Sequence, residues 1–233
     1  KSESYQMGVL VKETSYFFDG TPRSQITYNA PAPGMSTVNR WYLAGTPKCN
    51  EIYNGNQLVT GEYFTTLNQR DAFVDHTQGT RLSRDDYGQL ISTDKIENGQ
   101  MVLSQSYHPN GSPKETIPYR NERIDGVKRT YLPAGEPDTI EQWVNGQQEG
   151  TSVVYQHGEK YAEIPYANGE KHGMECRYRD GKTKVQDIGW LNGQMHGPAR
   201  TYVGETEKTE WYYRGRVVSK TDYEFMTNRP IVR

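Results

Sequence analysis

Histidine is the side chain in this 233-residue sequence that first suggests metal chemistry. His172 and His196 stand at equivalent positions of two similar stretches, each directly before a glycine. If each stretch forms two strands, the two rings lie on the order of 10 Å apart, which is wide for two ligands of one ion. We therefore expect both residues to fill turn positions set by the pattern, and we expect no metal. The other histidines are His76, His108 and His157.

The two cysteines, Cys49 and Cys176, could form a disulfide only in a compact fold. In a linear array of strands they are separated by roughly 50 Å, whereas a disulfide needs Cα atoms within about 7 Å. No histidine stands at an obvious position to activate Cys176 as a nucleophile. The sequence therefore predicts two free, structural thiols.

Pairs of carboxylates are the remaining candidates for catalysis. Asp85 with Asp86, and Glu205 with Glu207, could do acid–base work only in a cleft, which a flat sheet rarely offers. No glycine-rich segment has the spacing of a phosphate-binding loop between a strand and a helix. The expectation is therefore a protein that is not an enzyme, with no catalytic residue and no cofactor.

A repeat organises the chain and sets where these side chains lie. Asn-Gly, or an eroded form of it, recurs every 23 or 24 residues, with an aromatic residue two positions before the asparagine and a glycine five positions after it. The period is clearest at Asn121, Asn145, Asn168 and Asn192. A second series, in which a tyrosine stands shortly before a glycine, has the same period. Two series with one period indicate a repeat protein of about nine units. The early units match the motif less well, and the one near Tyr63–His76 lacks both glycines.

The aromatic residues of the two series are the candidate binding residues. They could stack on a partner or form the core, and both interpretations hold if one face of a sheet is buried and the other open. The row before the second glycine contains Tyr107, Tyr131, Tyr155, Tyr178 and Tyr202. The row before Asn-Gly contains Tyr119, Trp143, Tyr166 and Trp190.

Each unit has the signals of a β-hairpin. Asn-Gly supplies the positive φ angles of a tight turn, and Ala162, Ile164 and Tyr166 alternate with more polar neighbours. The predicted fold is all-β: an elongated, twisted, single-layer antiparallel meander in which stacking stabilises hairpins that are marginal alone. We expect one continuous array with eroded repeats over 1–105, well-formed repeats over 106–215 and a cap over 216–233.

The composition agrees with a thin β-structure. Only 33% of residues are hydrophobic and the mean hydropathy is −0.94, but 12% are aromatic and the net charge is −2. This is too little aliphatic material for a thick core, so we expect the tyrosine and tryptophan rows to replace one. The near-neutral charge does not indicate nucleic-acid binding. No stretch approaches the length of a membrane-spanning helix.

Three segments carry a resemblance to a known family: "NGEKHG" (168–173), "NGQMHG" (192–197) and "NGQQEG" (145–150). With the tyrosine–glycine series, they resemble the MORN repeat, and more closely its bacterial variant of 23–24 residues. The resemblance implies a hairpin array that serves as a scaffold or binding surface. Eukaryotic members are linked to membranes and dimeric scaffolding, and many bacterial variants carry an antitoxin label.

Choline-binding cell-wall modules are the alternative family. Gly189-Trp190 and the aromatic run 211–213 are similar to their aromatic-glycine hairpins. Their period is nearer 20 residues, and they need paired aromatic residues in successive units, which this sequence has only at isolated places. The MORN-like interpretation is therefore preferred.

The expected function is a protein–protein interaction scaffold or binding module of antitoxin-like character, with homodimerisation through open sheet edges as one mode of assembly. The alternative is a module of the cell envelope or surface that binds lipid or glycan. The sequence begins with Lys1 in place of Met, which gives a weak expectation of an exported protein whose N-terminus has been removed. The sequence names no particular partner.

Overall fold

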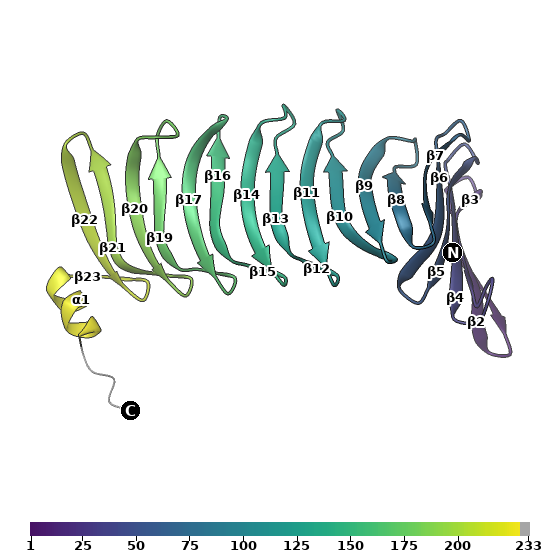
Figure 1. Cartoon of the computed structure of the whole chain (residues 1–233), viewed down its shortest axis with the longest axis horizontal. Helices are drawn as coiled ribbons and strands as arrows, with labels where there is room; N and C mark the ends of the chain where they lie inside the picture. Colours follow the sequence, from purple (N-terminus) through teal and green to yellow (C-terminus); the bar gives the residue numbers. More distant parts are fainter. Residues whose placement is uncertain (229–233) are drawn as a thin grey trace. The chain divides into compact units, whose positions relative to one another are not determined.

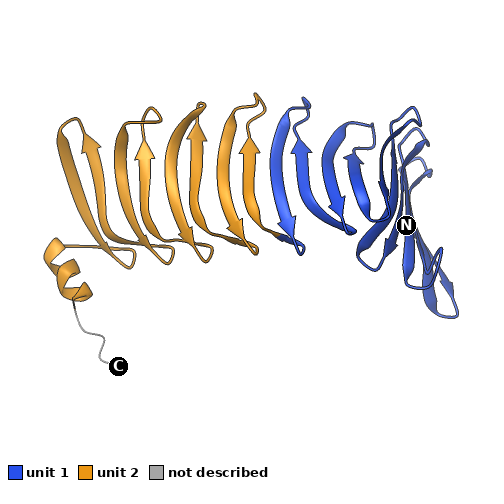
Figure 2. Ribbon diagram, in the orientation of Figure 1, with its two compact units in different colours: residues 1–123 blue, residues 124–233 orange. Residues whose placement is uncertain are grey.

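The structure is a computed structural model that describes residues 1–228, so the end of the cap expected over 216–233 lies outside the described residues. The described chain contains 23 strands and one helix. It divides into two compact units, unit 1 (Lys1–Arg123) and unit 2 (Ile124–Arg233), which are coloured separately in Figure 2. Within each unit the strands follow one another as antiparallel hairpins, which confirms the predicted all-β meander (Figure 1).

Unit 1 contains most of the eroded repeats. Its strands are β1 (Ser2–Gln6), β2 (Val9–Tyr16), β3 (Pro22–Tyr28), β4 (Met35–Trp41), β5 (Pro47–Asn54), β6 (Gln57–Phe64), β7 (Arg70–Asp75), β8 (Gln78–Arg84), β9 (Leu90–Glu97), β10 (Gln100–Tyr107) and β11 (Pro113–Arg120). The two-residue strand β12 (Arg123–Ile124) lies where the chain divides.

Unit 2 contains regular repeats and the C-terminal helix. Its strands are β13 (Gly126–Tyr131), β14 (Pro137–Val144), β15 (Gln147–Gln148), β16 (Gly150–Gln156), β17 (Glu159–Ala167), β18 (Glu170–Lys171), β19 (Gly173–Tyr178), β20 (Lys184–Leu191), β21 (Gln194–Val203), β22 (Thr206–Tyr213) and β23 (Arg216–Val218). Helix α1 (Lys220–Thr227) follows, and Ser219 caps it by accepting a hydrogen bond from the Asp222 N–H.

The Asn-Gly positions form the tight turns that the sequence predicts. Asn168 and Gly169 have φ angles of 54° and 83°, as a hairpin with two left-handed turn residues requires. The eroded copy at His76 has the same geometry, with a φ of 46°. A further hairpin, turning at Met7 and Gly8, precedes the copies found in the sequence. The turn geometry is therefore kept where the motif is lost, at some cost in backbone strain.

Adjacent hairpins of unit 2 are joined at these turns. The N–H of the turn glycine, or of Gly215 after Arg214, donates to a carbonyl of the preceding hairpin. This bond satisfies a backbone donor that the turn itself leaves without a partner, and it repeats with the period of the sequence. The bonds are Gly146 to Ile124 (2.8 Å), Gly169 to Gln148 (3.0 Å), Gly193 to Lys171 (2.9 Å) and Gly215 to Met195 (2.8 Å).

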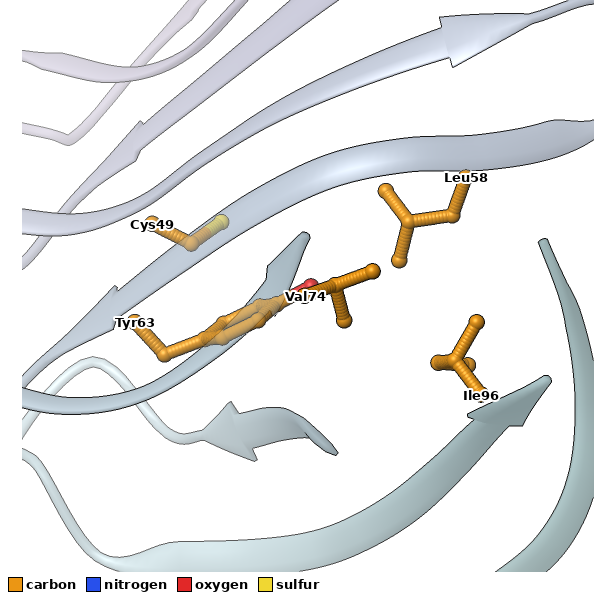
Figure 3. Packing of buried hydrophobic residues seen from close by; sticks show 5 residues of the cluster. All are labelled: Cys49, Leu58, Tyr63, Val74 and Ile96. Atoms are coloured by element: carbon orange, nitrogen blue, oxygen red, sulfur yellow. The ribbon is translucent and has the colours of Figure 1, made fainter. Parts of the chain in front are cut away.

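Unit 1 has a hydrophobic core, and this corrects the expectation that aromatic rows take its place. The core lies among β5, β6, β7 and β9, because the sheet turns and brings these strands together (Figure 1). Figure 3 shows its buried members, which are Cys49, Leu58, Tyr63, Val74 and Ile96. Gly61 leaves the space that the Tyr63 ring occupies, since a Cβ on Gly61 would lie 2.5 Å from the tyrosine hydroxyl. Burying each large side chain stabilises the fold by about 1.5–3 kcal/mol.

Buried side chains in unit 2 are mostly small or polar. The buried hydrophobic residues among 124–228 are Ala162, Ile188 and Ala199, and the buried polar ones are Ser152, Glu175 and Asp187. Helix α1 adds a local aromatic contact at the end of this unit. The ring of Tyr223 lies 5.0 Å from that of Trp211 and 5.3 Å from that of His196, measured between centroids. Aromatic and ionic contacts therefore stabilise unit 2, as expected for a thin sheet.

Candidate functional site

The tyrosine row joins the two strands on either side of an Asn-Gly turn. The hydroxyls of Tyr178 and Tyr202 each donate, over 2.7 Å, to a carboxylate on the strand before the turn, Glu163 and Asp187 respectively. The hydroxyl of Tyr107 lies 3.0 Å from that of Thr93. The hydrogen bond to Glu163 raises the pKa of Tyr178. All nine aromatic candidates are half-buried.

The second aromatic row lies among charged side chains. Lys171 Nζ stands 4.5 Å from the Trp190 ring centroid and 2.9 Å from a carboxylate oxygen of the fully buried Glu175. Trp143 Nε1 donates to Glu141 over 2.9 Å. Cation–π and charge-assisted contacts of this kind are strengthened by partial burial.

The two rows lie on opposite faces of the unit 2 sheet. Tyr178 reaches Glu163, which pairs with Cys176 across the strands, whereas the lysine over Trp190 bonds to Glu175. Neighbouring residues of a strand point to opposite faces, so Glu175 and Cys176 mark different sides. Both rows thus have contacts that stabilise the sheet, and their role in partner binding stays a prediction.

The residue directly before the glycine of "HG" contacts the Asn-Gly turn of the next repeat. His196 Nδ1 accepts a 3.4 Å hydrogen bond from the Arg214 N–H, and His172 Nδ1 lies 3.2 Å from Asn192 Oδ1. Glu149 takes the same place and accepts from the Asn168 N–H over 2.8 Å. Burial and then the charge of Arg214 lower the pKa of His196, which favours a neutral ring that can accept. Residues 1–228 contain no cluster of three or more histidines, cysteines or carboxylates able to hold a metal.

Both cysteines are free thiols, Cys49 in unit 1 and Cys176 in unit 2. Burial raises the pKa of the Cys49 thiol, and Glu51 raises it further, while Arg40, with Nη1 3.4 Å from the sulfur, opposes the shift. A raised pKa disfavours the thiolate, so this thiol is poorly suited to act as a nucleophile.

The hairpin tips of unit 1 expose an unusual set of large apolar side chains. We define the apolar tips as Phe18, Leu43, Leu67 and Tyr87, one from each of four successive tips. Phe18 is fully exposed, and Leu67 and Tyr87 are 78% and 80% exposed. Turn positions ordinarily hold polar residues or glycine. The sequence carries this signal in segments such as "FFDG" and "TLNQ", where a large apolar residue stands beside typical turn residues.

Hydrogen bonds and ion pairs hold these tips in fixed places. Tyr42 donates to the Phe64 carbonyl over 2.6 Å, and Thr46 Oγ1 donates to the Thr66 carbonyl over 3.1 Å. These bonds join the tip that carries Leu43 to the tip that carries Leu67.

A second set of contacts centres on Asp86, in the tip that carries Tyr87. Its carbonyl accepts from the Leu43 N–H over 3.2 Å. Its carboxylate binds Arg23 at 2.9 Å and Lys48 at 3.3 Å. The tips therefore present their apolar side chains from a supported surface, and a supported surface loses less conformational entropy when a partner binds.

Comparison with known proteins gives no functional assignment. No family model matches the sequence, and no curated protein matches it. Two similar solved structures are crystal structures of TcdB2-TccC3, one with Cdc42 and one without the hypervariable C-terminal region. Each has 12% sequence identity and covers 88% of this chain and 13% of the other chain, with TM-scores of 0.28 and 0.26. The chain thus spans a small part of the proteins it matches. No helix among the described residues is long and apolar enough to cross a membrane.

Proposed function

We propose that this chain is a non-enzymatic, MORN-like repeat protein that binds a protein partner through the apolar tips of unit 1. The observation that carries the proposal is the row of exposed apolar side chains on tips that hydrogen bonds and an ion pair hold together. Soluble proteins rarely leave large apolar side chains gathered in this way unless the surface is used. Aromatic and large aliphatic side chains also supply most of the binding energy at protein interfaces.

The charges of the same tips favour a protein partner over a membrane. The carboxylate of Asp19 accepts from the Thr21 N–H over 2.9 Å, and that of Asp85 accepts from the Gln89 N–H over 2.8 Å. Insertion of the tips into lipid would carry these carboxylates toward the hydrocarbon and toward anionic headgroups, which is costly. A protein interface accommodates such groups in its polar rim.

A comparison of two triple variants tests the proposal. The tip variant combines Phe18→Ser, Leu67→Ser and Tyr87→Ser, while the control combines Val144→Ser, Val203→Ser and Val217→Ser, which removes three exposed apolar side chains from unit 2. The whole chain is used as bait in an extract of its native cell, and bound material is identified by mass spectrometry. We expect one protein in near-equal amount with the wild type and the control, and at least tenfold less with the tip variant.

Two results would count against the proposal. One is recovery of lipid or glycan alone, with equal binding of the tip variant to anionic vesicles or wall glycan, which would support the envelope-associated alternative. The other is a protein bound equally by all three baits, which would move the interface away from the tips. A recovered partner that is a toxin would support the antitoxin-like expectation.

A further inference from the structure

A cavity of about 490 Å³ lies inside the turn of the unit 1 sheet, and none of the four apolar tip side chains lines it, although Arg23, Lys48 and Asp86 both line it and support the tips. Strands β2, β3, β4 and β5 provide one part of its lining, and β8 provides another. The sequence gives no sign of it, because its charged residues stand in separate repeats. It forms where the eroded units allow the sheet to turn.

Cations outnumber carboxylates in this lining. Glu51 and Asp86 are the acidic lining residues, against five basic ones. Two of the cations also bind carboxylates outside the lining, Arg81 with Asp94 and Arg84 with Asp71. Counting all four carboxylates still leaves one net positive charge, in a chain whose net charge is −2. The basic lining residues are Arg23, Arg40, Lys48, Arg81 and Arg84.

Two donors of the lining residues have no hydrogen-bond acceptor within residues 1–228. Arg84 Nε is buried and has no hydrogen-bond partner there, although the other two nitrogens of its guanidinium bond to Gly88 and Asp71. The hydroxyls of Ser15 and Ser24 lie 2.7 Å apart, so one of them donates to the other and the second hydrogen is left to donate elsewhere. A buried donor without a partner destabilises the fold, and a bound acceptor would remove this penalty.

We propose that this cavity binds a tetrahedral oxyanion, a phosphate group that is either free or the end of a monoester. Planar guanidinium groups donate paired hydrogen bonds to phosphate oxygens, and serine hydroxyls complete such sites. Its surroundings provide a contrast. A neighbouring cavity of about 410 Å³ is lined by Glu51, Glu62 and Asp75 against Arg70, so it has the opposite charge and does not suit an anion.

Binding to the wild-type chain is measured first, by isothermal titration calorimetry with inorganic phosphate, sulfate, acetate and chloride at one ionic strength. We expect phosphate and sulfate to bind and acetate and chloride not to. Phenyl phosphate is the further ligand: tighter binding than phosphate identifies an ester as the ligand, and weaker binding identifies the free ion. Equal responses to all four anions, or binding of acetate alone, would overturn the proposal.

Two arginine variants locate the site. Arg23→Gln removes a cation from the cavity lining, and Arg70→Gln is its matched control outside that lining. Their side chains are 57% and 59% exposed, and each makes one ion pair and stacks on one phenylalanine, Phe17 or Phe73. We expect phosphate affinity to fall roughly tenfold in Arg23→Gln and to stay unchanged in Arg70→Gln. Equal affinities in both variants would contradict the assignment.

A spectroscopic measurement needs no variant. In a ¹⁵N-labelled sample the Arg84 Nε–H resonance reports directly on the buried donor without a partner. Phosphate should shift this resonance together with the amides of Ser24 and Arg40, and should leave the Arg70 signals in place. A titration that moves only exposed signals would show that phosphate binds outside the cavity and would overturn the proposal.

Discussion

Unit 1 and unit 2 are built from one hairpin pattern but are stabilised in different ways. In unit 2 each hairpin contacts the next through the N–H of its turn glycine and through the residue before the "HG" glycine. Unit 1 has turn bonds of the same kind, for example from the Gly99 N–H to the Thr77 carbonyl, but its sheet also turns, encloses a core and a basic cavity, and joins its tips across hairpins. The unit with the eroded motif is thus the one with a hydrophobic core, and the unit with the most regular repeats buries few large side chains.

The largest difference should appear when a buried aliphatic side chain is shortened. Leu58→Ala opens a cavity in the unit 1 core, and we expect a loss of about 3 kcal/mol in the stability of that unit. Ile188→Ala in unit 2 should cost less, about 2 kcal/mol, because its surroundings are thin enough to collapse or hydrate. Hydrogen exchange of the β6 and β20 amides measures the two units separately. Equal losses would show that the units do not differ in packing.

Removal of one tyrosine hydroxyl sharpens the comparison. Tyr63 donates over 2.9 Å to Glu51, whose side chain is 2% exposed, so Tyr63→Phe leaves a buried carboxylate with Arg40 as its charged partner. We expect a cost of about 2 kcal/mol. Tyr178→Phe removes the corresponding bond to Glu163, which water reaches, and should cost less than about 1 kcal/mol. Denaturant titration of the two variants measures both losses of unfolding free energy. A larger loss for Tyr178→Phe would contradict the expectation that the buried hydrogen bond contributes more.

The smallest expected effect is on the pH dependence of the stability of unit 2. Burial raises the pKa of Asp187, but hydrogen bonds from Tyr202, Lys184 and Cys176 outweigh it and the net shift is downward. A lowered folded-state pKa stabilises the protein at pH values above the unfolded-state pKa of about 4, and this contribution is lost as pH falls through the folded-state pKa. Asp187→Asn should therefore cost about 1 kcal/mol at pH 7, and this cost should shrink as pH falls through the folded-state pKa.

The control for the acid experiment is Glu205→Gln, at an exposed turn of the same unit. Stability against denaturant is measured for the wild type and both variants at several pH values. The difference between the wild type and Asp187→Asn should shrink toward low pH, while Glu205→Gln should follow the wild type throughout. A difference that is constant with pH would mean that the charge of Asp187 does not stabilise unit 2.

Local features of the fold were predictable from the sequence, and long-range ones were not. Asn168-Gly169 specifies its turn because few other dipeptides adopt two positive φ angles cheaply, so hairpins and fold class follow from the repeat. The sequence does not predict that Ile96 packs in one cluster with Leu58, because each is an ordinary apolar residue of a different strand. The turning of the sheet arises from the sum of small twists and the packing of several strands, which a pattern within one repeat does not encode.

The same limit applies to the candidate sites. Contacts between repeats explain His172 and His196, and equivalence with Glu149 in the sequence would have suggested an acceptor that holds the next turn. The apolar tips had a local signal, since Leu67 stands where a turn residue belongs. The basic cavity had none, because Arg23 and Arg84 come together only through the turn of unit 1.

The bonds between hairpin tips determine where the gene can change length. In unit 2 each hairpin depends on its immediate neighbour, so a duplication of one whole period would insert a hairpin that finds the partners it needs. In unit 1, Leu43 bonds to Asp86, two tips further along the chain, so an inserted period between them would separate the pair. Related genes that differ in repeat number should therefore gain or lose copies in the region that encodes unit 2, and should keep a constant number in the region that encodes unit 1.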